Sequence, residues 1–261
     1  MIQSEDQMLP IAGGRIFVRV WTPECAASSA PIILFHDSLG SVDLWRRFPE
    51  KLAEATDRRV IAFDRLGFGR SDTFPGHVPD DFMAREASET LPVLQREVAF
   101  TRFIACGHSV GGGMGVEAAA QHPSEALAVV TIGAQAFVEE QTLKGIREAR
   151  ARFASPDGLS RLARYHGDKA RWVVDAWTET WLDPARRGWT LDHALARLRC
   201  PVLAIHGEVD EYGSAEQPRR IASVTGGRLE LQSGIGHVPH RDAEGHVISL
   251  IVGFLAGLTE P

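Results

Sequence analysis

The sequence predicts an α/β protein with a mostly parallel sheet, and three observations lead to that prediction. Short runs of consecutive apolar residues, typical of strands buried on both faces, recur along the chain. Helix-like stretches lie between these runs, as the crossovers of a parallel sheet require. The alternation stops only between about residues 137 and 197, where the patterns are all helical. We therefore expect a core built from residues 1–136 and 198–261, with a helical insertion at 137–197.

The expected strands are short. The first spans residues 15–21, where the residue type alternates along the chain, so one of its faces is expected to be more exposed to solvent than the other. Runs that are apolar throughout, or nearly so, predict buried strands at residues 31–35, 60–63, 103–106, 128–132 and 201–205, and a further strand is expected at 228–231. Helical patterns predict helices at residues 44–55, 82–98, 110–121, 216–223 and 242–258.

The insertion is rich in tryptophan. Four of the six tryptophans lie in it, at Trp172, Trp177, Trp181 and Trp189. Aromatic residues at these spacings more often pack within a helical unit than touch a ligand. We therefore expect the insertion to contribute an apolar surface rather than to act as a flexible linker.

Composition excludes several classes of function. The 261 residues hold 34 acidic and 28 basic side chains, which gives a formal net charge of −6. Nucleic acids and anionic membranes are bound through concentrated positive charge, so neither is an expected partner. The basic stretch at 147–152 is expected to be a solvated helix face.

The chain shows no targeting or disulfide pattern. The first ten residues lack the basic and apolar regions of a secretory signal, and no apolar stretch reaches the ~18 residues of a membrane span. Cys25, Cys106 and Cys200 are odd in number and have no CxxC spacing, so neither a disulfide framework nor a zinc site is expected. These features predict a cytoplasmic protein that binds no metal.

One motif carries chemistry. The expected strand at 103–106 runs directly into Gly107, His108, Ser109, Val110 and Gly111, and a helix follows. This is G-x-S-x-G between a strand and a helix, the setting of a nucleophile elbow. Small residues two before and two after the serine let the backbone turn sharply, so that the hydroxyl stands exposed above the sheet. We therefore expect Ser109 to be a catalytic nucleophile.

A serine nucleophile needs a histidine base and an acid that orients the base. His237 follows the last expected strand in a loop, and Asp210 lies in the loop beyond the strand at 201–205. The order Ser109, Asp210, His237 is the order that accompanies this elbow. His240 is kept as a rival base and Glu208 as a rival acid, whereas His108 is expected to pack or to donate hydrogen bonds.

Several pieces together resemble the α/β-hydrolase family over nearly the whole chain. They are His36 after the strand at 31–35, and the stretches 64–72, 107–112, 206–210 and 236–237. The resemblance implies a doubly wound sheet and a triad of Ser109, Asp210 and His237. It also implies a helical cap after the sixth strand, which fits residues 137–197.

The same resemblance places an oxyanion hole. One amide is that of Val110, next to the nucleophile, and the other comes from the loop after His36, where we assign it to Ser38. The chain departs from the family here, because Asp37 stands where glycine is usual. We expect Asp37 to bond the backbone of its own loop, with contact to a cationic substrate as the alternative.

The expected function is hydrolysis of a carboxylic ester through an acyl-enzyme. The serine excludes the epoxide- and halide-processing members, which use an aspartate at the elbow. No phosphate-binding loop or complete G-x-G-x-x-G is present, so no cofactor is expected. The tryptophans with Phe137, Phe153 and Tyr165 suggest a largely apolar pocket for a small or medium substrate. Thioester, lactone or carbon–carbon bond hydrolysis, lyase chemistry and ligand binding without turnover remain open.

Overall fold

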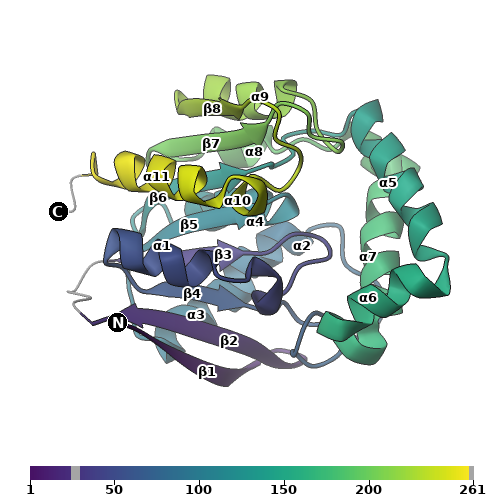
Figure 1. Ribbon diagram of the computed structural model, residues 1–261, viewed down its shortest axis with the longest axis horizontal. Coiled ribbons are helices and arrows are strands. Elements are labelled where there is room, and N and C mark those ends of the chain that lie inside the picture. Colours follow the sequence, from purple (N-terminus) through teal and green to yellow (C-terminus); the bar gives the residue numbers. More distant parts are fainter. Residues whose placement is uncertain (25–29, 259–261) are drawn as a thin grey trace.

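An eight-stranded sheet runs through the centre of the molecule (Figure 1). The computed structural model describes residues 1–24 and 30–258, so Cys25 lies outside the described residues. The strands follow the order β1-β2-β4-β3-β5-β6-β7-β8 across the sheet. Their bounds are β1 Ile2–Ile11, β2 Gly14–Pro23, β3 Ile32–Phe35, β4 Val60–Phe63, β5 Phe103–His108, β6 Ala126–Ile132, β7 Val202–Gly207 and β8 Arg228–Gln232.

The sheet is mostly parallel, which confirms the predicted fold class. Only β1 with β2 and β2 with β4 pair in the antiparallel sense, and the ladders from β4 to β8 are all parallel. The α-helices are α1 Phe48–Thr56, α2 Phe82–Arg85, α3 Leu91–Glu97, α4 Val110–Gln121, α5 Glu140–Phe153, α6 Pro156–His166, α7 Ala170–Leu182, α8 Asp192–Leu195, α9 Glu216–Thr225, α10 Pro239–Asp242 and α11 Glu244–Leu255. Short η segments are η1 Val42–Trp45, η2 Glu86–Thr90, η3 Gly167–Lys169 and η4 Pro184–Gly188.

Helices cover both faces of the sheet. Helices α1 and α11 lie against one face, and α3, α4, α8 and α9 lie against the other (Figure 1). The two resulting cores share no side chain: Ile33 and Phe35 of β3 belong to one and Ile32 and Leu34 to the other. This alternation explains why the central strands read as continuous apolar runs, since each face of each strand is buried.

Strand β1 is the element that the sequence analysis missed. It pairs with β2 over ten residues, from Ile2 with Pro23 to Ile11 with Gly14. Most of its side chains are exposed, as expected of a strand at the edge of the sheet. Because it buries little, it carries neither an apolar run nor a clean alternation, and its register comes from the hairpin with β2.

Three predicted helices are divided into shorter segments in the structure. The helix expected at 44–55 is two segments, η1 and α1, because Arg46 between them has a positive φ of 54°. The one expected at 82–98 contains a π-helical turn, η2, between α2 and α3. The one expected at 242–258 is preceded by a short separate helix, α10, which starts at Pro239, since proline suits the first position of a helix, and Ala243 at φ −135° divides α10 from α11.

The expected insertion is helical, and α5, α6 and α7 stand together beyond one end of the strands (Figure 1). Leu162 of α6 and Val173 and Val174 of α7 form a small core with Phe68, which lies in the loop after β4. Helix α8, near the end of the insertion, packs against α4 and α9 of the core. The limits 137–197 remain a prediction.

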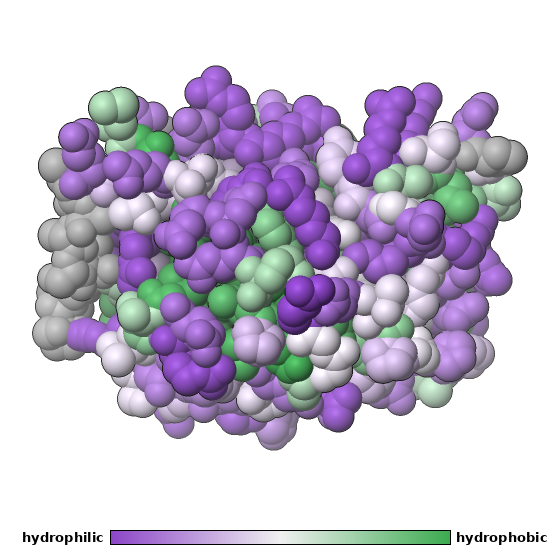
Figure 2. All heavy atoms as spheres, turned by 90° about the horizontal axis from the view of Figure 1, so that it is seen from below, coloured by the Kyte–Doolittle hydropathy of each residue, from purple (hydrophilic) through white to green (hydrophobic). Residues whose placement is uncertain are grey.

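The surface is mostly hydrophilic when seen from the side of the β1 edge, with apolar side chains gathered near the middle of that face (Figure 2). Among the residues that the structure describes, no helix is both long and apolar enough to cross a membrane.

Candidate active site

Ser109 sits at the sharp turn between β5 and α4. Its φ of 55° and ψ of −126° lie outside the regions that L-residues favour. The turn requires glycine on either side, because a Cβ on Gly107 would come within 2.0 Å of the Gly111 carbonyl oxygen, and a Cβ on Gly111 within 2.0 Å of the Phe35 carbonyl oxygen. The predicted motif therefore folds into a strained turn that presents the serine at the end of β5.

His237 and Asp210 meet beside this turn. The Nδ1 atom of His237 lies 2.7 Å from Oδ2 of Asp210, which accepts its hydrogen bond. Burial alone lowers the pKa of His237, but the hydrogen bond to Asp210 and its charge outweigh burial and raise that pKa above its ordinary value. With a proton fixed on Nδ1, the Nε2 atom of the neutral ring is left as an acceptor.

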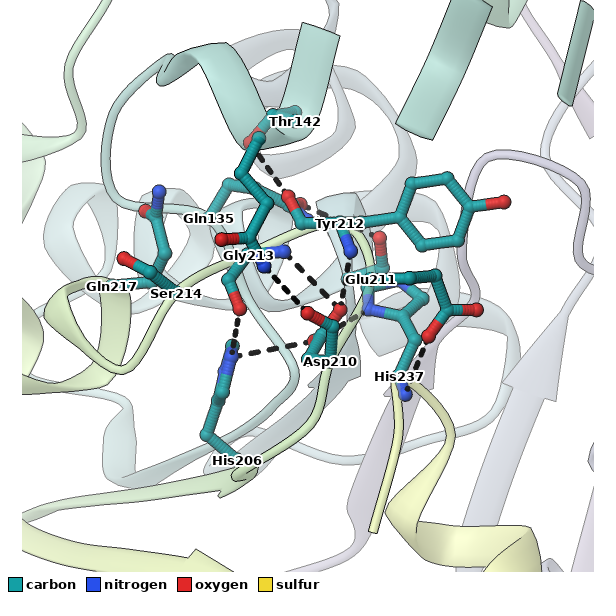
Figure 3. A network of polar contacts seen from close by, with 12 residues as sticks. Gln135, Thr142, His206, Asp210, Glu211, Tyr212, Gly213, Ser214, Gln217 and His237 are labelled. Atoms are coloured by element: carbon teal, nitrogen blue, oxygen red, sulfur yellow. Dashed lines mark hydrogen bonds and ion pairs between the residues drawn. The ribbon is translucent and has the colours of Figure 1, made fainter. Parts of the chain in front are cut away.

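Asp210 is held by its own loop (Figure 3). Its Oδ1 accepts hydrogen bonds from the amides of Tyr212 at 2.7 Å and Gly213 at 3.2 Å. Its Oδ2 also lies 3.3 Å from Nε2 of His206, which is 3.0 Å from the Gly213 carbonyl oxygen. Burial raises the pKa of Asp210, but the hydrogen bond and charge of His237 outweigh it, so that pKa stays below its ordinary value.

Neither rival residue takes part in the Asp210–His237 pair. His240 is buried among Trp45, Phe48 and His108, and burial holds its pKa well below the ordinary value. Its Nδ1 has no partner among the described residues. Glu208 is exposed. The structure therefore joins Asp210 to His237 and gives neither rival the corresponding partner.

The hydroxyl of Ser109 donates to Oε1 of Gln135 at 3.4 Å. Gln135 is 5% exposed and follows the end of β6, next to β5 in the sheet. The sequence analysis did not single it out. Its place directly after a buried strand, at the edge that carries Ser109, is the signal that could have found it.

The two predicted oxyanion-hole residues lie together. Ser38 and Val110 both line a small recess of about 20 Å³, and Ser38 also lines the main cavity beside Ser109. Within the described parts of the chain, neither amide donates to a backbone carbonyl. Val110 does not line the cavity that holds Ser109, so its part in an oxyanion hole stays a prediction.

Asp37 is used within its own loop, which confirms the favoured expectation. Its Oδ1 accepts from the Leu39 amide at 2.8 Å, and its Oδ2 lies 3.3 Å from Nδ1 of His108. The Nε2 atom of His108 in turn lies 2.8 Å from the His237 carbonyl oxygen. Burial raises the pKa of Asp37, but the hydrogen bond and charge of His108 outweigh it, and the pKa is lowered.

A cavity of about 540 Å³ opens above Ser109, between the core and helices α5 to α7. Trp177 and Trp181 line it, whereas Trp172 packs on Phe68 and Phe74, so the tryptophans divide between the two expected roles. The other lining residues are Asp37, Ser38, Leu39, Leu44, His108, Ser109, Gln135, Thr142, Ile146, Arg152, Phe153, Gly158, Arg161, Leu162, Tyr165, Tyr212, His237, Val238, His240 and Arg241.

The cavity agrees in part with the expected pocket. Phe153 and Tyr165 line it as expected, and Phe137 does not, because it forms a β-bridge with Thr190 instead. In the described parts of the chain, no group of three or more His, Cys, Asp and Glu side chains is arranged to hold a metal ion.

Comparisons with known proteins agree with this architecture. A profile of the alpha/beta hydrolase fold family matches residues 30–197. Serine hydrolase BPHL of Homo sapiens is 30% identical over 160 residues, which cover 58% of this chain and 53% of that protein. The chain thus spans about half the length of this relative.

Solved structures align over almost the whole chain. Carboxylesterase CesB (YbfK) from Bacillus subtilis superposes with a TM-score of 0.73 at 20% identity, over 98% of this chain and 93% of that one. The enol-lactonase from Burkholderia xenovorans LB400 superposes with a TM-score of 0.74 at 20% identity, over 96% of this chain and 100% of that one. These likenesses concern the fold. With a family profile that covers more than half of its residues, this chain belongs to the alpha/beta hydrolase fold family.

Proposed function

We propose that the protein is a serine hydrolase that cleaves a carboxylic ester through an acyl-enzyme. The observation that carries the proposal is the 2.7 Å hydrogen bond between Asp210 and His237, beside a serine held on a strained turn. A nucleophile, a base and a group that orients the base are the three parts that acyl transfer by serine requires.

The reaction begins when the Ser109 hydroxyl turns from Gln135 toward His237. His237 Nε2 takes the hydroxyl proton while Oγ attacks the ester carbonyl carbon. The amides of Ser38 and Val110 donate to the oxygen that becomes negative. The intermediate then collapses, the alcohol leaves with the proton from His237, and the acyl group stays on Ser109.

Water completes the cycle. It attacks the acyl-enzyme while His237 again takes a proton, and collapse returns that proton to Ser109 and releases the acid. Asp210 keeps the ring in the tautomer that accepts at Nε2 and stabilises the positive charge that the ring carries in each half-reaction.

The cavity supports a small or medium substrate. Its volume of about 540 Å³ lies within the range of ligand pockets, and much of its wall is apolar, including Leu44, Ile146 and Leu162. Thioesters and lactones present the same carbonyl to the same nucleophile, and one structural neighbour is described as an enol-lactonase. Carbon–carbon bond hydrolysis, lyase chemistry and ligand binding without turnover are the outcomes against which the proposal is tested.

A fluorophosphonate reports the nucleophile directly. We expect peptide mass spectrometry to find one adduct, on Ser109, and expect labelling to slow strongly in His237→Ala. The labelled enzyme should lose turnover of p-nitrophenyl esters. Absence of labelling and of ester, thioester and lactone turnover in folded protein would overturn the proposal and favour ligand binding or lyase chemistry.

A further inference from the structure

Three arginines line the cavity that holds Ser109. Arg152 comes from the last turn of α5, Arg161 from α6, and Arg241 from α10. The first two belong to helices of the expected insertion, whereas Arg241 lies in the core and follows His237 by four residues. Positive charge therefore reaches the cavity from two sides, although the protein as a whole carries a formal net charge of −6.

Among the residues that the structure describes, none of the three arginines forms an ion pair with a carboxylate, and Arg152 donates instead to the Tyr212 hydroxyl at 3.3 Å. Arg147, on the same helix as Arg152, shows the contrast, because it pairs with Glu140 at 2.6 Å.

The one carboxylate that lines the cavity is already engaged. Asp37 accepts from the Leu39 amide through Oδ1, and its Oδ2 lies 3.3 Å from Nδ1 of His108, so both of its oxygens already have protein partners. The remaining lining side chains are neutral, aromatic or histidine. A cationic substrate would meet three like charges and no free acid, whereas an anionic one would meet three donors of charge-assisted hydrogen bonds.

We propose that the substrate carries an anionic group besides the scissile carbonyl, and that Arg152, Arg161 and Arg241 bind it. This proposal rests on the serine hydrolase function proposed above and names a substrate class for it. Arginine suits this task because its planar guanidinium binds carboxylate or phosphate oxygens in pairs. The apolar walls then hold the chain that joins the anionic group to the ester.

The test is a set of p-nitrophenyl esters with acyl chains of equal length. The chain ends in a methyl group (hexanoate), a carboxylate (adipate monoester), a phosphate or a trimethylammonium group. At low ionic strength we expect kcat/KM to be about tenfold higher for the carboxylate or the phosphate ester than for the methyl ester, and lowest for the cationic one. Added salt should reduce this preference, because all three arginines are exposed to solvent.

Arginine variants with matched controls localise the effect. Arg152→Gln, Arg161→Gln and Arg241→Gln should each lower the ratio of anionic to neutral kcat/KM by about three- to fivefold. Arg150→Gln on α5 and Arg164→Gln on α6 remove the same charge from positions that do not line the cavity, and the ratio should stay at the wild-type value. A ratio of one or less in the wild-type enzyme, or equal losses in the control variants, would overturn the proposal.

The outcomes separate this proposal from the proposed function. If the methyl ester is hydrolysed and no anionic ester is preferred, the substrate class is wrong and the serine hydrolase assignment stands. If no ester reacts and Ser109 takes no label, the assignment itself fails. Calorimetric binding of monomethyl adipate, which keeps one carboxylate, compared with neutral methyl hexanoate then decides on the anionic subsite without turnover. Tighter binding of monomethyl adipate that Arg161→Gln weakens supports the subsite, and equal binding overturns it.

Discussion

Two aspartate–histidine pairs border the same serine, and they differ in whether the second ring nitrogen of the histidine already faces a protein oxygen. In one pair, Asp210 binds Nδ1 of His237 at 2.7 Å, and the ring faces the cavity. In the other, Asp37 lies 3.3 Å from Nδ1 of His108, whose Nε2 is 2.8 Å from the His237 carbonyl oxygen. Both pairs contribute to the lining of one cavity.

The difference shows that the second ring nitrogen decides the role of each pair. Both nitrogens of His108 face oxygen acceptors, so neither is free to take a proton from Ser109. His237 has one committed nitrogen and one available. The Asp37–His108 pair therefore joins the loop of Ser38 to the loop of His237, and we call it the brace. In the proposed mechanism the Asp210–His237 pair supplies the base and the group that orients it.

The largest effect that this comparison predicts is a difference in kcat between variants of the two histidines. His237→Ala should lower kcat by about 10⁴-fold or more, because the nucleophile loses its base. His108→Ala should lower kcat by about tenfold at most, through misplacement of the two loops. Steady-state kinetics on a p-nitrophenyl ester measure both.

Ser109→Ala is the control for this prediction. Residues that act as one unit are not additive, so the double variant Ser109→Ala with His237→Ala should be as slow as either single variant. A comparable loss in His108→Ala and His237→Ala, with both proteins folded by circular dichroism, would contradict the distinction between base and brace.

Replacing each of the two aspartates should lower kcat by very different factors. Asp210→Asn should lower kcat by about 10³- to 10⁴-fold, since an amide favours the wrong tautomer of His237. Asp37→Asn keeps the size of the side chain and an oxygen for the Leu39 amide, so kcat should fall by less than about tenfold. Equal losses in the two variants would show that Asp37 also serves the base.

The pH dependence sharpens the comparison further. His237 must be neutral to act as a base, and Asp210 raises its pKa above the ordinary 6.5. The acid limb of kcat/KM should therefore lie above pH 6.5, with activity rising as pH rises through that pKa. In Asp210→Asn the limb should move to lower pH, whereas in Asp37→Asn it should move much less, because Asp37 acts on His237 through charge alone. A limb that both variants leave in place would contradict this assignment.

The sequence predicted the parts of this site that lie directly after buried strands. Ser109 follows β5 and Asp210 follows β7, and the carboxyl ends of parallel strands meet at one edge of the sheet. Apolar runs and the G-x-S-x-G spacing are local sequence patterns, so they can be recognised without knowledge of the tertiary structure. The same holds for Asp37, whose contact with Leu39 spans only two residues.

What the sequence did not predict depends on contacts between distant segments. The bond from His108 to the His237 carbonyl joins residues 129 positions apart, and the arginines meet only because α5, α6 and α10 surround one cavity. Strand β1 was missed for a related reason, because its polar side chains give no pattern without the partner strand.

The smallest predicted effect concerns stability, and it tests whether the brace is a coupled pair. Asp37→Asn and His108→Asn should each destabilise the fold by about 1 kcal/mol, and the double variant should lose less than the sum, by about 0.5–1 kcal/mol. Urea denaturation at pH 7 measures the cycle.

The direction in which this stability difference changes with pH follows from the lowered pKa of Asp37. A carboxyl whose folded pKa is depressed contributes stability above its unfolded pKa and loses it as pH falls toward the folded value. The advantage of wild type over Asp37→Asn should therefore be full at neutral pH and shrink below about pH 4. Additive single effects, or an advantage that persists unchanged into acid, would show that Asp37 and His108 are merely neighbours, and the brace would then rest on the His108–His237 bond alone.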